Sequence, residues 1–286
     1  MSEQSNLTLN LEKTADEIRQ SVIKMLVEAK SGHVAGPLDM ADVFTALYFH
    51  ILNIDPENPL KADRDRVMLS NGHICPVWYA TLAHRGFLPL SELSTLRKLG
   101  TRLQGHPHIY EPPGIDASAG PLGQGLSQAI GMALAYRMDG LNHARIYCLG
   151  SDAEIQEGQI WEAAMFAGNK RLNNLTWIID RNNIQIDGFT ENIMPIEPLR
   201  DKLEAFNWYV LEIDGHNFDE IIASCNHAKA IYERPTVIIA HTIAGKGVDF
   251  MEYKFEWHSK TFKPGEAEKA LDELRTLQGK IASEHQ

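Results

Sequence analysis

The chain has 286 residues, 44% hydrophobic and 23% charged, which is ordinary for a soluble globular protein with a full core. Its net charge of −11, without a long basic run, argues against binding to nucleic acid or to an acidic membrane surface. No apolar stretch approaches the length of a membrane span, and the N-terminus lacks the pattern of a signal peptide. Because the three cysteines lie far apart without metal-ligand spacing, we expect reduced thiols and a cytoplasmic protein.

The N-terminal half is predicted to be mainly helical. Apolar residues recur every three to four positions over residues 8–30, which is typical of an amphipathic helix ending at Gly32. Further helices are predicted at residues 38–52, 76–85, 91–100 and 124–137, and a short strand at 67–69. A long loop rich in glycine and proline, residues 102–125, precedes the last of these helices. Such ordered loops tend to carry function.

Residues 144–188 form the unit around which the chain is organised. A short apolar run ends at Gly150 and predicts a buried strand. Apolar residues then recur at helical spacing from near Ile155 to Gly168, and a second apolar run covers residues 175–179. Strand, helix and strand in this order predict two parallel strands joined by a crossover.

The remaining pattern continues this alternation. Strands are predicted at residues 209–213 and 236–240, with a helix between them at 218–232 and a terminal helix at about 264–285. No internal repeat or linker is present. We therefore predict an α/β fold with a mostly parallel five-to-six-stranded sheet and helices on both faces, in a single domain over residues 1–286.

Two oxygen-bearing side chains follow the central strands. Asp152 comes just after the first strand and Asn182 just after the second, so both lie at the carboxyl edge of the sheet, where such folds bind ligands. Carboxylate and amide oxygens suit Mg²⁺ or another hard divalent cation, Ca²⁺ or Mn²⁺, and so few protein ligands indicate that phosphate oxygens complete the site. The alternative is that Asp152 caps the following helix and Asn182 makes a turn.

Four of the twelve histidines lie on loops beside glycine or near strand ends: His33, His73, His106 and His258. No pair has the spacing of a zinc-protease motif. Taken singly, each fits a structural role better than a catalytic one, but loops at one sheet edge can bring them into a single cleft.

Together these motifs resemble those of transketolases. Asp152 and Glu154 around a small residue, followed later by Asn182, look like the thiamine diphosphate motif of that family, except that Ala153 replaces a glycine. The segments SGH, NGH, GHP, GPLGQG and a late WH occur in the family's order and span residues 12–262. The family usually has a segment similar to HPGAPLG where this chain has HVAGPLD. We therefore expect Val34 and Asp39 to alter the entrance of the substrate site.

The resemblance implies a thiamine diphosphate-binding fold that holds thiamine diphosphate and Mg²⁺. It implies proton transfer and contacts with sugar hydroxyls by three histidines: His33, His106 and His258. It assigns the metal to Asp152, Asn182 and the backbone carbonyl of Ile184. Cofactor contacts are implied for His73, Gly120, Leu122, Asp152, Ala153, Glu157, Asn182, Lys246 and His258.

The expected function is that of the N-terminal subunit of a split transketolase in pentose phosphate metabolism. Such a subunit would transfer a ketol unit between sugar phosphates only with a C-terminal partner that carries the pyrimidine-binding domain, in an α2β2 assembly. Two alternatives stay open. One is another thiamine diphosphate enzyme, such as the α subunit of a 2-oxo-acid dehydrogenase or a deoxyxylulose-phosphate synthase; the other is a non-catalytic cofactor-binding subunit.

Overall fold

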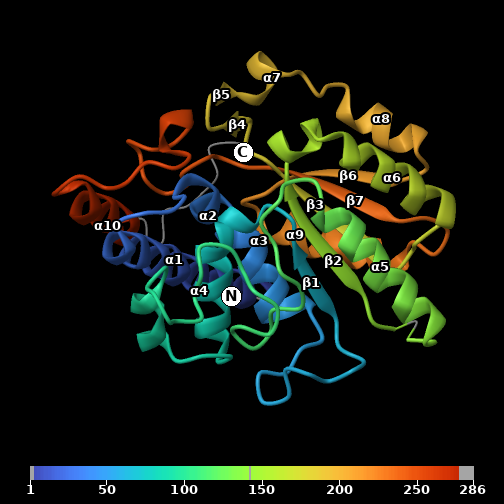
Figure 1. Cartoon of the computed structure of the whole chain (residues 1–286), viewed down its shortest axis with the longest axis horizontal. Coiled ribbons are helices and arrows are strands. Elements are labelled where there is room, and N and C mark those ends of the chain that lie inside the picture. The colour runs from blue at the N-terminus through green and yellow to red at the C-terminus, as the bar shows by residue number, and fades with distance from the viewer. Residues whose placement is uncertain (1–2, 142, 277–286) are drawn as a thin grey trace.

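A parallel β-sheet lies at the centre of the molecule (Figure 1). The computed structural model describes residues 3–141 and 143–276. Within them five parallel strands pair in the order β1–β2–β3–β7–β6. Their bounds are β1 Arg66–Leu69, β2 Ile146–Ser151, β3 Leu175–Arg181, β6 Tyr209–Asp214 and β7 Thr236–His241. The predicted α/β fold with a parallel sheet of five to six strands is therefore confirmed.

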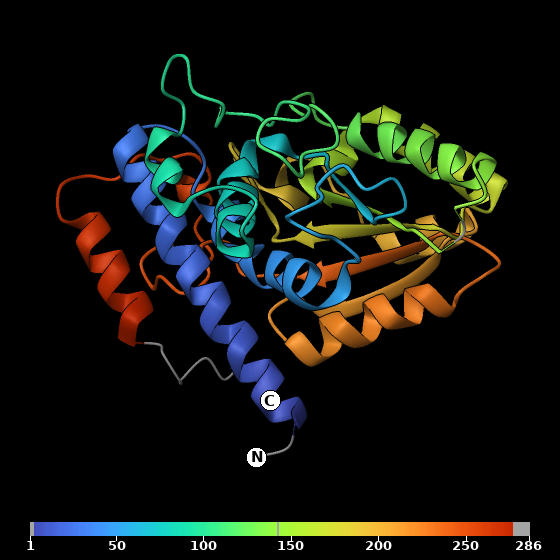
Figure 2. The ribbon, with the colours of Figure 1, turned by 90° about the horizontal axis from the view of Figure 1, so that it is seen from below.

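Helices cover both faces of the sheet (Figure 2), and alternate strand residues point into two cores. Tyr147 and Leu149 pack on the face covered by α1 (Glu3–Ala29), α3 (Ala41–Ala46), α4 (Cys75–Arg85) and α9 (Phe218–Ala230). Cys148 and Trp177 pack on the face covered by α5 (Gly125–Met138), α6 (Gly158–Lys170) and α8 (Leu199–Ala205). Every residue of β2 and β3 is buried. The sequence of these strands therefore does not show the alternation of apolar and polar residues that marks a strand with one exposed face.

The segment after α1 differs from the predicted helix at residues 38–52. Helix α2 (Ala35–Asp39) begins earlier, and a break at Met40 separates it from α3, which continues into a π-helical turn over Leu47–Ile51. Pro37 is compatible with this early start because it lies in the first turn, where N–H groups have no intrahelical acceptor. Val34 and Asp39 are buried, with exposed fractions of 1% and 0%, so neither side chain lines the entrance of the substrate site directly, and an effect on it stays a prediction.

Two other predicted helices are corrected. Residues 91–100 form no α-helix: a 3₁₀ helix spans Leu90–Thr95, and the chain then turns because Arg97 adopts φ +59° and donates its N–H to the Leu103 carbonyl at 2.8 Å. The helix expected to start near Ile155 begins only at Gly158, after a 3₁₀ turn over Ala153–Gln156. Apolar spacing does not distinguish such a short turn from the first turn of an α-helix.

Several short elements after β3 were not predicted. They are the hairpin strands β4 (Ile184–Gln185) and β5 (Gly188–Phe189), the helix α7 (Thr190–Ile193), and α8. The C-terminal helix α10 (Glu266–Thr276) buries Ala270 and Leu274 beside α1. The rest of the helix predicted at 264–285 lies outside the described residues.

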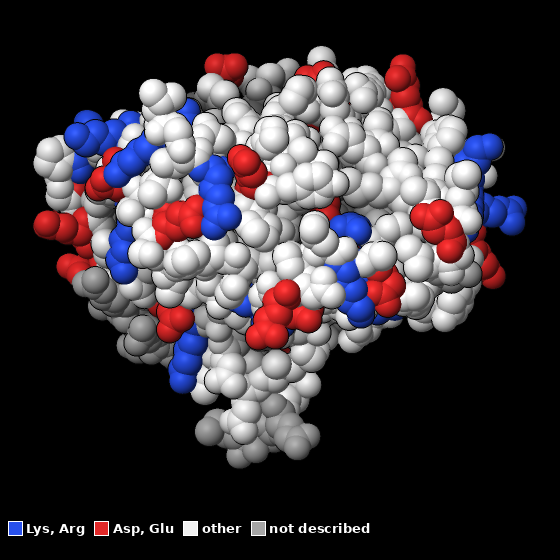
Figure 3. Space-filling view, turned by 60° about the horizontal axis from the view of Figure 1, so that its bottom comes forward, with Lys and Arg blue, Asp and Glu red and all other residues white. Residues whose placement is uncertain are grey.

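Charged side chains of both signs share the surface. On the face in Figure 3, Lys and Arg side chains lie singly or in small groups among Asp and Glu, without a continuous basic patch. Among the described residues, no helix is long and apolar enough to cross a membrane.

Candidate active site

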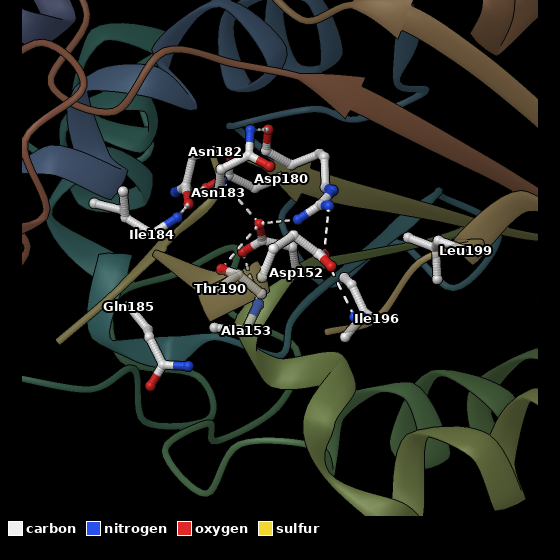
Figure 4. Close-up of polar contacts among 12 residues, drawn as sticks. Asp152, Ala153, Asp180, Asn182, Asn183, Ile184, Gln185, Thr190, Ile196 and Leu199 are labelled. Atoms are coloured by element: carbon white, nitrogen blue, oxygen red, sulfur yellow. Dashed lines mark hydrogen bonds and ion pairs between the residues drawn. The ribbon is translucent and has the colours of Figure 1, made fainter. Parts of the chain in front are cut away.

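Asp152 and Asn182 meet at the carboxyl edge of the sheet (Figure 4). Asp152 is fully buried directly after β2, and its Oδ1 accepts the N–H of Ala153 at 2.7 Å. Its Oδ2 accepts from Nη1 of Arg181 at 2.8 Å and from the N–H of Asn183 at 2.8 Å. The predicted convergence of the two strand ends is therefore confirmed.

Asn182 is held by partners on both sides of its carboxamide. Its Nδ2 donates to Oδ2 of Asp39 at 3.0 Å and to Oδ2 of Asp180 at 2.8 Å. Its Oδ1 accepts the N–H of Ile184 at 3.1 Å. Asp180 also accepts a hydrogen bond from Thr242, which follows β7, so the ends of β3 and β7 and helix α2 contribute to this polar cluster.

Burial dominates the electrostatics of these carboxyl groups. It raises the pKa of Asp152, an effect opposed by the adjacent Arg181 guanidinium. Burial also raises the pKa of Asp180 to about 8 and that of Asp39 well above its usual value. The negative charge of Asp152 adds to the shift of Asp180, and the negative charge of Asp180 adds to the shift of Asp39. Because burial disfavours the charged form of a carboxyl group, Asp39 and Asp180 together hold a proton at neutral pH.

The donor set fits a divalent cation that is shared with phosphate. Among the described residues no three His, Cys, Asp or Glu side chains form a metal-binding group, so these side chains alone do not make a closed protein cage. Oδ1 of Asp152 and Oδ1 of Asn182 each accept one backbone N–H and keep lone pairs for a cation. A cation would also offset the burial of the Asp152 charge. Ile184 is buried in β4, and its carbonyl as a third ligand stays a prediction.

Three of the predicted histidines form one cluster. The ring centroid of His33 lies 4.5 Å from that of His73 and 5.2 Å from that of His258, and the His73 and His258 centroids are 5.4 Å apart. Burial lowers the pKa of His33 to about 4 and that of His258 to about 4, and it lowers the pKa of His73 in the same direction. All three imidazoles are therefore neutral at pH 7. Nδ1 of His33 is buried and has no hydrogen-bond partner among the described residues.

His106 stands apart from this cluster, beside the GPLGQG segment. A Cβ atom placed on Gly120 would lie 3.8 Å from Cγ of His106. The His106 side chain is exposed, and its pKa is lowered first by partial burial and then by the positive charge of Arg97. Gly120 and Gly123 have φ values of +159° and +83°; the value at Gly123 favours glycine.

A buried pair, Ser70 and Glu154, anchors this glycine-rich segment. Oε1 of Glu154 accepts from Oγ of Ser70 and from the N–H of Gly123 at 2.7 Å, while Oγ of Ser70 accepts the N–H of Gly125 at 3.0 Å. Both side chains are buried, with exposed fractions of 1%. The contact between these two residues was not predicted. Its signals in the sequence are that each residue follows a strand end and that Glu154 belongs to the segment resembling the thiamine diphosphate motif.

The other predicted contact residues lie around the same edge. Leu122 is 40% exposed, and Glu157 is exposed at the start of α6, beside Gly123. Ala153 follows Asp152 and is half-buried. Lys246 is half-buried in the loop after β7, whose Gly245 N–H donates to the Ala35 carbonyl near His33. Within the described residues its ammonium group makes no hydrogen bond. Contacts of these four with a cofactor stay predictions.

Comparison with known proteins identifies the family. Residues 11–277 match the model of the transketolase thiamine diphosphate-binding domain. The chain belongs to the transketolase family. The alternatives of a 2-oxo-acid dehydrogenase subunit and of a deoxyxylulose-phosphate synthase are thereby displaced.

Two relatives of similar length are named as subunits of transketolases. The chain is 46% identical to 6-deoxy-6-sulfo-D-fructose transketolase subunit SqwG of Clostridium sp. (strain MSTE9), over 91% of this chain and 93% of that one. It is 39% identical to one of the subunits of the apulose-4-phosphate transketolase of Phocaeicola vulgatus, over 96% of this chain and 97% of that one.

Longer transketolases match only in part. The chain is 36% identical to the transketolase of Rattus norvegicus and spans 42% of its length. The crystal structure of transketolase from Campylobacter jejuni has a TM-score of 0.87 at 34% identity, and 42% of that chain is covered. The fold of this chain is therefore the fold of the thiamine diphosphate-binding part of a transketolase.

Proposed function

We propose that this chain is the thiamine diphosphate-binding subunit of a two-subunit transketolase, a single domain of that type. With its partner it transfers a two-carbon ketol unit from a ketose phosphate to an aldose. The observation that carries this proposal is the convergence of buried Asp152, half-buried Asn182 and three neutral histidines at one edge of the sheet.

Asp152, Asn182 and the carbonyl of Ile184 would hold Mg²⁺, with Ca²⁺ or Mn²⁺ as substitutes. The cofactor's diphosphate would complete the coordination, as expected for a hard cation with few protein ligands. Further cofactor contacts would come from His73, Gly120, Leu122, Ala153, Glu157, Lys246 and His258. When bound, thiamine diphosphate supplies the carbon nucleophile and the electron sink for ketol transfer.

The histidines would move protons at the substrate. His33 and His258 are neutral at pH 7 because burial lowers each pKa to about 4, so each imidazole has one nitrogen able to accept a proton. In such a shielded site, they would orient the sugar hydroxyls as well as accept their protons. His106, outside the cluster, would contact the substrate from the loop beside Gly120.

The partner would be a C-terminal transketolase subunit with the pyrimidine-binding domain, in an α2β2 assembly in the cytoplasm. Relatives that match this chain over nearly their full length are named as subunits, which supports a divided enzyme. Large apolar side chains near the site are also exposed, as expected of a surface that a partner covers. They are Leu122, Ile186, Phe189, Ile193 and Met194.

The test is to assay the chain by itself and with its partner in the presence of thiamine diphosphate and Mg²⁺. Ketol transfer should appear only with the partner. The donors should include phosphorylated ketoses of pentose phosphate metabolism and, because SqwG is a similar protein, 6-deoxy-6-sulfofructose. Strong transfer by the chain alone would contradict the two-subunit proposal. Cofactor binding without transfer to any acceptor would favour the non-catalytic role.

A further inference from the structure

A buried carboxyl group lies beneath one of the proposed metal ligands. Asp39, the last residue of α2, has an exposed fraction of 0% and contacts Asn182, which is 143 positions away in the sequence. Glycine stands at this position in the HPGAPLG-like text that the segment resembles, so the resemblance does not account for a carboxyl group here. An apolar residue would avoid the cost of burying a carboxyl group here.

The contact bears on which way the Asn182 carboxamide points. An amide group has two N–H donors on one side and an oxygen acceptor on the other. In Asn182 one N–H faces Asp39 and the other faces Asp180, at 3.0 and 2.8 Å, while the oxygen accepts the Ile184 N–H at 3.1 Å. A flipped amide would direct its nitrogen at a backbone donor and its oxygen at two carboxyl groups that share one proton, so it would keep at most one of the three bonds.

Asp39 supplies the acceptor for one Asn182 N–H group, and this acceptor does not belong to the strand that carries Asn182. Asp180 lies two residues before Asn182 on the same segment, so it moves with the strand end. Asp39 comes from α2, whose five residues are all buried, and therefore ties the amide to a separate rigid element. With both carboxyl groups in place the amide has one orientation relative to Asp152 across the strand pair.

We propose that Asp39 is a positioning residue that fixes the Asn182 carboxamide with its oxygen turned toward the cation of the cofactor. This inference rests on the proposed function, because it takes Asn182 as a ligand of that cation. Groups that orient a metal ligand commonly contribute about 10- to 100-fold to metal affinity. Since Asp180 would still hold one N–H, we expect an effect near the lower limit for loss of Asp39.

The experiment measures Mn²⁺ affinity by electron paramagnetic resonance titration of the complex with its partner and thiamine diphosphate. Asp39→Ala removes the acceptor, and Asp39→Asn keeps an oxygen that can accept from Asn182. Asp42→Asn is a matched control on the next helix. Asp42 is also buried, but its hydrogen bonds go to Arg19 and His216 rather than to the site.

Mn²⁺ should bind about 10-fold more weakly to Asp39→Ala, and within about 3-fold of wild type to Asp39→Asn and Asp42→Asn. Thermal midpoints without cofactor show whether each variant folds, and Asp39→Asn keeps the test valid if Asp39→Ala does not. The positioning role alone would be overturned if Asp39→Ala bound Mn²⁺ with wild-type affinity. It would also be overturned if Asp39→Asn and Asp42→Asn lost as much Mn²⁺ affinity as Asp39→Ala. A wild-type complex that binds neither Mn²⁺ nor thiamine diphosphate would overturn the proposed function as well.

Discussion

At the scale of single residues, the proposed metal ligand Asp152 and the proposed substrate contact His106 lie in opposite environments. Asp152 is fully buried and depends on Arg181, whose Nη2 also contacts Glu191 at 2.7 Å and Glu197 at 2.9 Å. Arg181 thus links the proposed metal ligand to the segment that follows β5. His106, in contrast, is exposed and free to contact a sugar.

Replacing Asp152 by Asn should weaken cofactor binding while preserving the shape of the site. The amide has no negative charge to offset that of Mg²⁺, and Arg181 loses its buried carboxylate partner. We expect at least about 10-fold weaker binding of thiamine diphosphate with Mg²⁺, measured by calorimetry with the partner present. An unchanged affinity would show that Asp152 is not a metal ligand.

Removing the loop histidines should affect turnover more than folding. His106→Ala and His258→Ala should each lower kcat by about 10²- to 10⁴-fold, the usual contribution of one acid–base group. The thermal midpoint of His106→Ala should stay at the wild-type value because that side chain is exposed. His143→Ala, which removes an exposed histidine near Asp63, is the control. Normal turnover with a large loss of stability would indicate a structural role instead.

At the scale of elements, the strands and helices that show a regular apolar pattern could be predicted from the sequence. The apolar runs of β2, β3 and β7 and the helical spacing of α1, α5 and α9 identified a parallel sheet and placed Asp152 and Asn182 at one edge. The hairpin β4–β5 and the turn at Arg97 were missed because these depend on a few local hydrogen bonds and backbone angles. The Ser70–Glu154 pair was missed because it joins residues 84 positions apart.

Glu154→Gln should loosen the glycine-rich segment. The carboxylate accepts hydrogen bonds from Ser70, Gly123 and Ser151. In glutamine one of the two oxygens is replaced by an NH₂ group, which cannot accept a hydrogen bond and would face a donor. Hydrogen bonds to a charged group are worth about 1.5–3 kcal/mol each, so we expect a stability loss of about that size in denaturant unfolding. Hydrogen exchange should accelerate at residues 120–125. Glu162→Gln, on the exposed side of α6, should change neither measurement.

At the scale of the whole molecule, the two edges of the sheet have different charge chemistry. Helix C-termini gather at the amino edge, where Arg137 donates to the carbonyls of Lys170 and Arg171 after α6, and Arg145 donates to that of Ala228 in α9. Cations suit these negative dipole ends. The carboxyl edge instead collects buried carboxyl groups and neutral histidines, so groups with strongly shifted pKa values lie close together there.

This clustering predicts opposing effects of pH on stability. The pKa of His258 falls from about 6.5 in the unfolded chain to about 4 in the fold, so the unfolded state binds more protons between these values and acid destabilises the protein. Asp180 has a pKa raised to about 8, so the folded state retains a proton that the unfolded state releases above pH 4, and stability falls as the pH rises toward 8.

Two variants separate these contributions in urea unfolding measured across pH. His258→Asn should lose less stability than wild type between pH 6.5 and 5, because it removes a group that must stay neutral in the fold. Asp180→Asn should lose less than wild type between pH 5 and 8, because its side chain carries no charge at any pH. His143→Ala should follow the wild-type curve throughout. Parallel curves for all four proteins would contradict the assignment of these shifts to the carboxyl edge.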